Sequence, residues 1–110
     1  MGRIAMAWLA LFVAGLFEAG MVVGLKLSEG FTRLWPGLLV LVSGGLSFFL
    51  LSLAMRTISA GTAYAIWTAI GASGAVLVGI LVFGEPADLL RLGGIAFVLV
   101  GVLMLRFAEA

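Results

Sequence analysis

Four long runs of apolar residues make up nearly all of this 110-residue chain, at residues 4–27, 36–55, 62–83 and 89–107. A helix crosses the hydrocarbon core of a bilayer with about 20 apolar residues. The runs are continuous and lack the alternation of a membrane β-strand. Only 10% of the residues are charged, against about 25% in a soluble domain. The sequence therefore predicts an all-α integral membrane protein in which residues 1–110 form a single domain of four transmembrane helices surrounded by lipid.

Several classes of chemistry are excluded by composition. The chain has no cysteine and no histidine, which removes disulfides, the usual zinc sites and imidazole acid–base catalysis. A net charge of +1 is too small to indicate binding to nucleic acid. We therefore expect no metal, no cofactor and no enzymatic activity.

The six basic residues divide evenly between the two ends of a four-span layout. One end carries Arg3, Arg56 and Arg106, and the other carries Lys26, Arg33 and Arg91. The orientation of a membrane protein follows the Lys/Arg bias between its two sides, so the basic residues of this sequence do not specify one orientation in the membrane. Either folding or an assembly factor fixes one orientation, or copies insert both ways and pair as an antiparallel dimer. Such a dimer would supply between two chains the inverted repeats that larger transporters carry within one.

Glu18 is the one acidic residue inside a predicted span, since the other four acids lie in connectors or near the C-terminus. A charged side chain at the bilayer centre costs about 2.5–3.5 kcal/mol on insertion scales, and desolvation favours its protonated form. One interpretation is a protonated glutamic acid hydrogen-bonded between helices. No Lys or Arg lies at comparable depth, however, so Glu18 is predicted to bind a proton or a cation.

Three other polar or aromatic side chains at membrane depth are candidates for the same site. Tyr64 and Trp67 are three residues apart, share a helix face and could stack on a delocalised cation; the alternative is an interfacial aromatic belt. Ser47 could donate to Glu18 or accept from a ligand N–H, although serines in membrane helices often serve only packing.

Gly94 and Gly101, seven residues apart in the fourth span, lie on one stripe of a left-handed helix crossing. We interpret this span as a dimerisation helix, with packing inside the monomer as the alternative. Four helices carrying one acid enclose little volume, which also favours an oligomer.

Two motifs give the chain a resemblance to a known family over its full length. They read SEGFTRLWP at residues 28–36 and GTAYAIWT at residues 61–68, in a four-span chain with a lone glutamate in the first span. The sequence is similar to the small multidrug resistance transporters. The resemblance implies an antiparallel dual-topology homodimer in the bacterial inner membrane that exchanges protons for small organic cations by alternating access. It implies that Glu18 of both chains is the shared proton and substrate site. Ser47 would match the serine that hydrogen-bonds near that glutamate, and Tyr64 and Trp67 the aromatic residues that line the pocket.

The branch of the family is indicated by smaller features. Thr62, Thr68 and the Gly-Glu-Pro at residues 84–86 resemble the guanidinium exporters, whereas Met21 stands where that branch usually has tryptophan. Met21 is three residues from Glu18, which predicts that the two share a helix face, and its flexible side chain would loosen the pocket. We expect a proton-coupled exporter of guanidinium or small substituted guanidinium-type cations. The alternatives are a broad multidrug exporter of quaternary ammonium or lipophilic cations, a subunit of a heteromeric pair, and a membrane protein that transports nothing.

Overall fold

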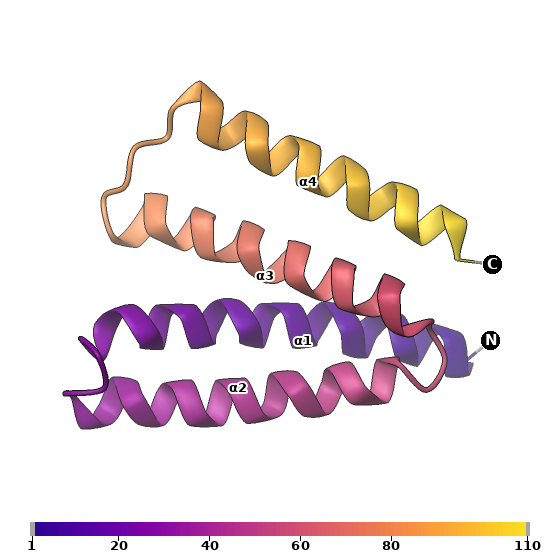
Figure 1. Cartoon of the computed structure of the whole chain (residues 1–110), viewed down its shortest axis with the longest axis horizontal. Helices are drawn as coiled ribbons and strands as arrows, with labels where there is room; N and C mark the ends of the chain where they lie inside the picture. Colours follow the sequence, from indigo (N-terminus) through magenta and orange to yellow (C-terminus); the bar gives the residue numbers. More distant parts are fainter. Residues whose placement is uncertain (1, 110) are drawn as a thin grey trace.

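The computed structural model describes residues 2–109, and four α-helices occupy most of that range (Figure 1). Their bounds are Gly2–Leu27 for α1, Leu34–Ala54 for α2, Ala60–Val82 for α3 and Leu89–Ala108 for α4. Each helix begins and ends within two residues of a predicted span. All four are long and apolar enough to cross a membrane. The expected all-α architecture with four membrane-spanning helices is confirmed.

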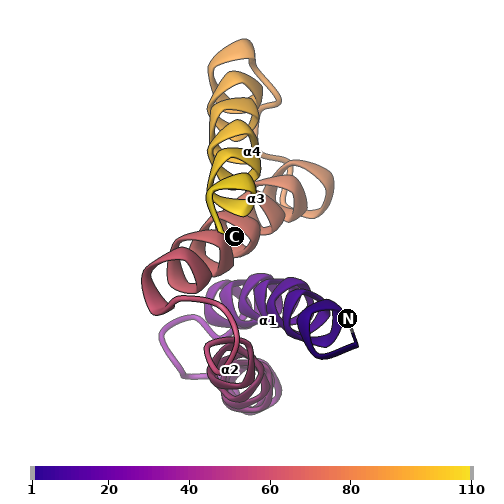
Figure 2. The same cartoon turned by 90° about the vertical axis from the view of Figure 1, so that its right-hand side faces the viewer.

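The helices run up and down, so that both termini lie at one end of the bundle (Figure 1). The helix α1 packs along α2 and across α3, whereas α2 and α3 touch each other little. Seen end-on, α4 stands beside α3 and away from α1 and α2 (Figure 2). None of the residues of α4 is buried. Helices α1, α2 and α3 therefore form the core, and α4 has an open face.

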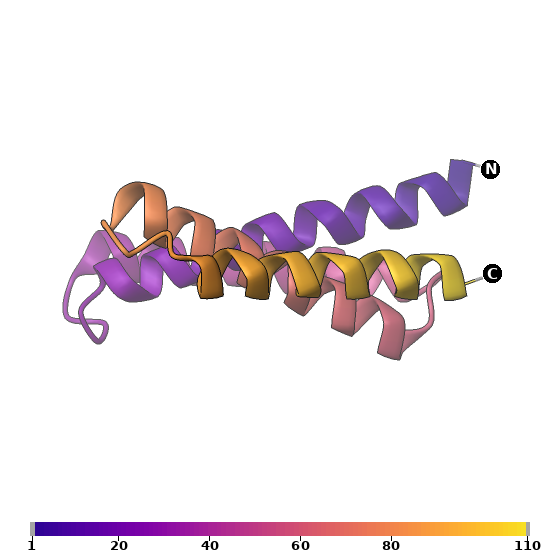
Figure 3. The same ribbon diagram turned by 90° about the horizontal axis from the view of Figure 1, so that it is seen from above.

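Small residues allow α1 to approach its two neighbours closely. A Cβ atom at Gly24 would lie 2.9 Å from the side chain of Val40 in α2, and one at Gly15 would lie 2.5 Å from Ile70 in α3. Without a hydrophobic drive between helices in lipid, such close backbone contact is what holds them together. The two helices α1 and α3 cross near their middles (Figure 3), which brings the centre of α1 against the centre of α3.

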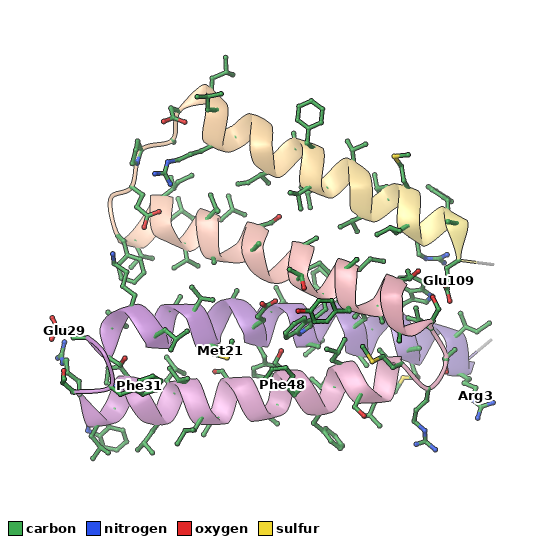
Figure 4. The ribbon with its side chains drawn as sticks, viewed as in Figure 1. Arg3, Met21, Glu29, Phe31, Phe48 and Glu109 are labelled. Carbon is green, nitrogen blue, oxygen red and sulfur yellow. The ribbon has the colours of Figure 1, made fainter. Side chains whose placement is uncertain are left out.

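A tight connector joins α1 to α2 at the end opposite the termini. Glu29, Gly30 and Phe31 have φ angles of 49°, 75° and 66°, in the left-handed region that non-glycine residues rarely adopt. Ser28 is buried and secures this turn: its hydroxyl donates to the carbonyl of Leu25 at 2.9 Å and accepts from the N–H of Phe31 at 3.1 Å. The turn fixes α2 antiparallel to α1 (Figure 4).

Polar contacts hold both ends of α4. Asp88 caps its first turn by accepting from the N–H of Arg91 at 2.8 Å. At the other end the Glu109 carboxylate accepts from the N–H and the hydroxyl of Ser59, each at 2.8 Å, just before α3 begins. These bonds, the backbone one foremost, hold the pKa of Glu109 below its usual range. The carboxylate thus ties the end of α4 to the start of α3.

Candidate functional site

Glu18 lies at the crossing of α1 and α3 and points its carboxyl group at Gly71. A Cβ atom at Gly71 would overlap Oε2 and Cδ of Glu18, so the carboxyl group occupies space that only glycine leaves free. Oε2 is buried, and it has no hydrogen-bond partner among residues 2–109. A buried polar atom is normally paired, and an unpaired one in this position is open to a proton or a ligand donor.

No basic side chain neutralises this carboxyl group within the described part of the chain. The one ion pair there joins Arg91 to Glu85 at 3.4 Å, at the end of the bundle. A glutamic acid bonded between helices would need a partner on α2 or α3, and the structure gives Oε2 none among residues 2–109. The geometry favours the interpretation of Glu18 as a binding group over that of a structural one.

Ser47 is completely buried and links three helices rather than bonding to Glu18. Its hydroxyl donates to the carbonyl of Ala14 in α1 at 2.6 Å and accepts from Nε1 of Trp67 in α3 at 2.8 Å. Ala14 lies one turn before Glu18, so this network holds the helix segment that carries the carboxyl group. Sequence reasoning missed the Ala14 carbonyl, because a backbone group gives no signal in residue type.

The aromatic side chains of α3 pair as expected and have a third neighbour. The ring of Trp67 lies 5.4 Å from Tyr64 and 5.5 Å from Phe48, centroid to centroid. Trp67 is 5% exposed and Tyr64 is 56% exposed, so within one chain Tyr64 offers the open ring and Trp67 supports it. Phe48 was not singled out from the sequence, although it directly follows Ser47.

Met21 lies against α2, whereas Glu18 lies against α3. The sulfur of Met21 is 3.0 Å from where a Cβ atom of Gly44 would be, and the side chain sits between α1 and α2 (Figure 4). Although they are three residues apart on α1, the two side chains therefore pack against different neighbouring helices. Met21 packs against Gly44, and Glu18 packs against Gly71. The sequence showed glycines in both spans without showing which side chain each glycine contacts.

Gly94 and Gly101 take no part in close packing inside the described chain. A Cβ atom at either position would meet nothing within 4 Å among residues 2–109. Packing inside the monomer, the alternative role for these glycines, gains no support from the structure. Their part in a dimer stays a prediction.

The described residues also contain no group of three or more His, Cys, Asp or Glu side chains that could hold a metal ion. The recorded neighbour of the Glu18 carboxyl group is Gly71, and its Oε2 is unpaired among residues 2–109. The chemistry available there is the binding of a proton or of an organic cation that offers N–H donors.

Comparison with known proteins adds to this geometry. The family model for the small multidrug resistance protein matches residues 6–106. Three similar proteins, each named a guanidinium exporter, come from Proteus vulgaris, Yersinia pestis and Salmonella typhimurium. The first two are 48% and 47% identical over 104 residues, covering 94% of this chain and 100% of each relative. The third is 44% identical over 103 residues, covering 94% of this chain and 98% of the relative. The expected resemblance is confirmed, and the chain belongs to the small multidrug resistance family.

Proposed function

We propose that this protein exports guanidinium or small substituted guanidinium-type cations in exchange for protons, as an antiparallel homodimer in the bacterial inner membrane. The observation that carries the proposal is Oε2 of Glu18, near the middle of α1, which is buried against Gly71 and has no hydrogen-bond partner among residues 2–109. The names of the three relatives support the same substrate class.

Guanidinium suits such a site for chemical reasons. It is planar, permanently charged and rich in N–H donors that fit carboxylate oxygens. Its flat face can stack on an aromatic ring, and Tyr64 offers an exposed ring next to the buried Trp67. Glu18 would bind the charge and Tyr64 the face, while Ser47 holds Trp67 and the α1 backbone in place.

Coupling to protons follows from competition for one carboxyl site. Two Glu18 side chains brought close together in a dimer cannot both ionise without cost, so their titrations are linked. A cation entering from the cytoplasm displaces protons, and protons entering from outside displace the cation. Identical chains in opposite orientations make the inward-open and outward-open states equivalent, with the roles of the two chains exchanged.

The proposed dimer is supported by two features. The basic residues are balanced three against three between the ends, which lets both orientations insert. The helix α4 has no buried residue and presents Gly94 and Gly101 unused by its own chain. A balanced count also disfavours obligate pairing with a different subunit, since such subunits tend to carry fixed, opposite biases.

A broad multidrug exporter is the second candidate, favoured by the replacement of a rigid indole with Met21. Within one chain Met21 packs onto Gly44, away from the Glu18 carboxyl group, so the first candidate needs no contribution from it. The substrate test is the transport current from proteoliposomes containing this chain alone, given guanidinium, a biguanide or a tetraalkylammonium ion. We expect currents with the first two. Currents with the tetraalkylammonium alone would favour the multidrug exporter, and none at all would favour a heteromeric pair.

A further inference from the structure

A cavity separate from Glu18 lies between α1 and α2 at the end of the bundle that carries both termini. Its volume is about 450 Å³. Its walls are apolar and include Met6, Ala10 and Val13 from α1 and Leu50 and Leu53 from α2. Arg3 and Arg56 also line it, and Arg3 lies at this end of the molecule (Figure 4). The cavity therefore combines a hydrocarbon-like wall with two guanidinium groups.

The two arginines have no acidic partner in the described part of the chain. Within residues 2–109 the one ion pair is Arg91–Glu85, at the opposite end. The third arginine of the terminal end, Arg106, lies over the ring of Trp8 with its guanidinium carbon 4.4 Å from the ring centre. Arg3 and Arg56 are thus the basic groups available at this cavity.

The ends of the bundle differ in net charge although their basic counts are equal. The terminal end has three basic residues and one acid, Glu109, which gives +2, and that acid is bonded to Ser59. The opposite end has three basic and three acidic residues, which gives zero; the acids there are Glu29, Glu85 and Asp88. With Glu18 counted, the sum is the net charge of +1. The terminal end is therefore the one that attracts anions.

We propose that this cavity binds an anionic phospholipid. The phosphate lies between Arg3 and Arg56, and an acyl chain lies along the apolar wall between α1 and α2. Helix ends of a membrane protein lie at the depth of the lipid headgroups, and arginine matches phosphate with paired N–H donors. A free phosphate would leave the apolar wall unused. A zwitterionic lipid such as phosphatidylcholine offers the same phosphate, but its choline cation offsets the attraction of the two arginines.

The test is native mass spectrometry of the full-length protein in a neutral detergent, with phosphatidylglycerol and phosphatidylcholine offered in equal amounts. Ala10→Phe fills the cavity without changing any charge, and Ala96→Phe, at an exposed position of α4, is its matched control.

A second variant pair tests the charge. Arg56→Gln is combined with Arg33→Gln, so that the two ends keep equal basic counts and insertion is not biased. The control combines Arg106→Gln with the same Arg33→Gln, and so removes a basic residue from the same end but outside the cavity.

Each basic group near an anionic headgroup contributes about five-fold in affinity. We therefore expect the wild type to retain phosphatidylglycerol about 25-fold more strongly than phosphatidylcholine, and the Arg56 variant to lose about five-fold of this against its control. Ala10→Phe should abolish retention, and soluble glycerol phosphate should not compete. Equal retention of the two lipids, equal behaviour within either matched pair, or competition by glycerol phosphate would overturn the proposal. The proposed binding of an anionic phospholipid does not depend on which cation the protein transports.

Discussion

Replacement of Gly71 by alanine tests whether this glycine seats the Glu18 carboxyl group. The new Cβ atom would overlap the carboxyl group, so the side chain must rotate away or α1 and α3 must separate. The matched control is Gly93→Ala in α4, where a Cβ atom meets nothing within 4 Å among residues 2–109. Both variants add one methyl group to a helix glycine, and only the first one touches the site.

The expected size of the effect follows from the contact that is lost. A hydrogen bond to a charged group contributes about 1.5–3 kcal/mol, and about 1.4 kcal/mol corresponds to a factor of ten. If guanidinium loses one such bond, its apparent KM should rise by roughly 10- to 150-fold. Overpacking should also lower the stability of the Gly71 variant by about 1–3 kcal/mol. The control should change neither quantity appreciably.

The assay is the guanidinium-driven current in proteoliposomes as a function of concentration, with thermal unfolding in detergent as the check on folding. A rescue experiment separates a steric effect from general damage. Glu18→Asp shortens the side chain by one methylene and makes room for the methyl group, so the double variant should be less impaired than the product of the two single effects. The contact between Gly71 and the Glu18 carboxyl group would be refuted by a wild-type KM for Gly71→Ala. It would also be refuted if the double variant were impaired by the full product of the two single effects.

Three further predictions concern the surroundings of the site. Ser47→Ala leaves the buried indole N–H unpaired and should lower stability by about 1–3 kcal/mol, measured by thermal unfolding; an equal loss for the exposed Ser52→Ala would contradict this. Because the pKa of Glu109 is lowered in the folded protein, its carboxylate stabilises the protein fully at pH values above the usual glutamate pKa of about 4.3. This contribution is lost as the pH falls through the lower pKa of the folded state. A wild-type pH–stability profile without that acidic step, or one identical to that of Glu109→Gln, would exclude the contact. Gly101→Leu should weaken dimerisation, measured as the yield of chemically cross-linked dimer, while leaving helix content unchanged. Equal dimer yields for Gly101→Leu and Gly93→Leu would show that Gly101 is not in the interface.

The helices were predictable because each apolar run satisfies its backbone within itself and must be long enough to cross the bilayer. The candidate binding group was predictable for a related reason. A carboxyl group inside a membrane span, such as that of Glu18, raises the free energy of insertion, so its presence indicates a functional role. Neither inference needed to know how the helices are rotated against one another.

The partners of these groups could not be predicted, because they depend on helix rotation and crossing. Three-residue spacing suggested that Met21 and Glu18 share a face. In the structure α1 packs between two helices, and Met21 contacts α2 whereas Glu18 contacts α3. Ser47 was considered as a donor to Glu18, whereas its hydroxyl donates to the Ala14 carbonyl. The contact of Glu109 with Ser59 joins residues 50 positions apart and depends on where α4 ends.

The central claim is that Glu18 binds protons and guanidinium in competition. The most direct measurement loads proteoliposomes with guanidinium, dilutes them into guanidinium-free buffer of the same pH, and follows the lumenal pH with an enclosed dye. For the wild type we predict that the lumen acidifies as guanidinium leaves, because protons enter in exchange. For Glu18→Gln, purified with an intact dimer, we predict no pH change. Guanidinium efflux without acidification in the wild type, or equal acidification with Glu18→Gln, would contradict the account.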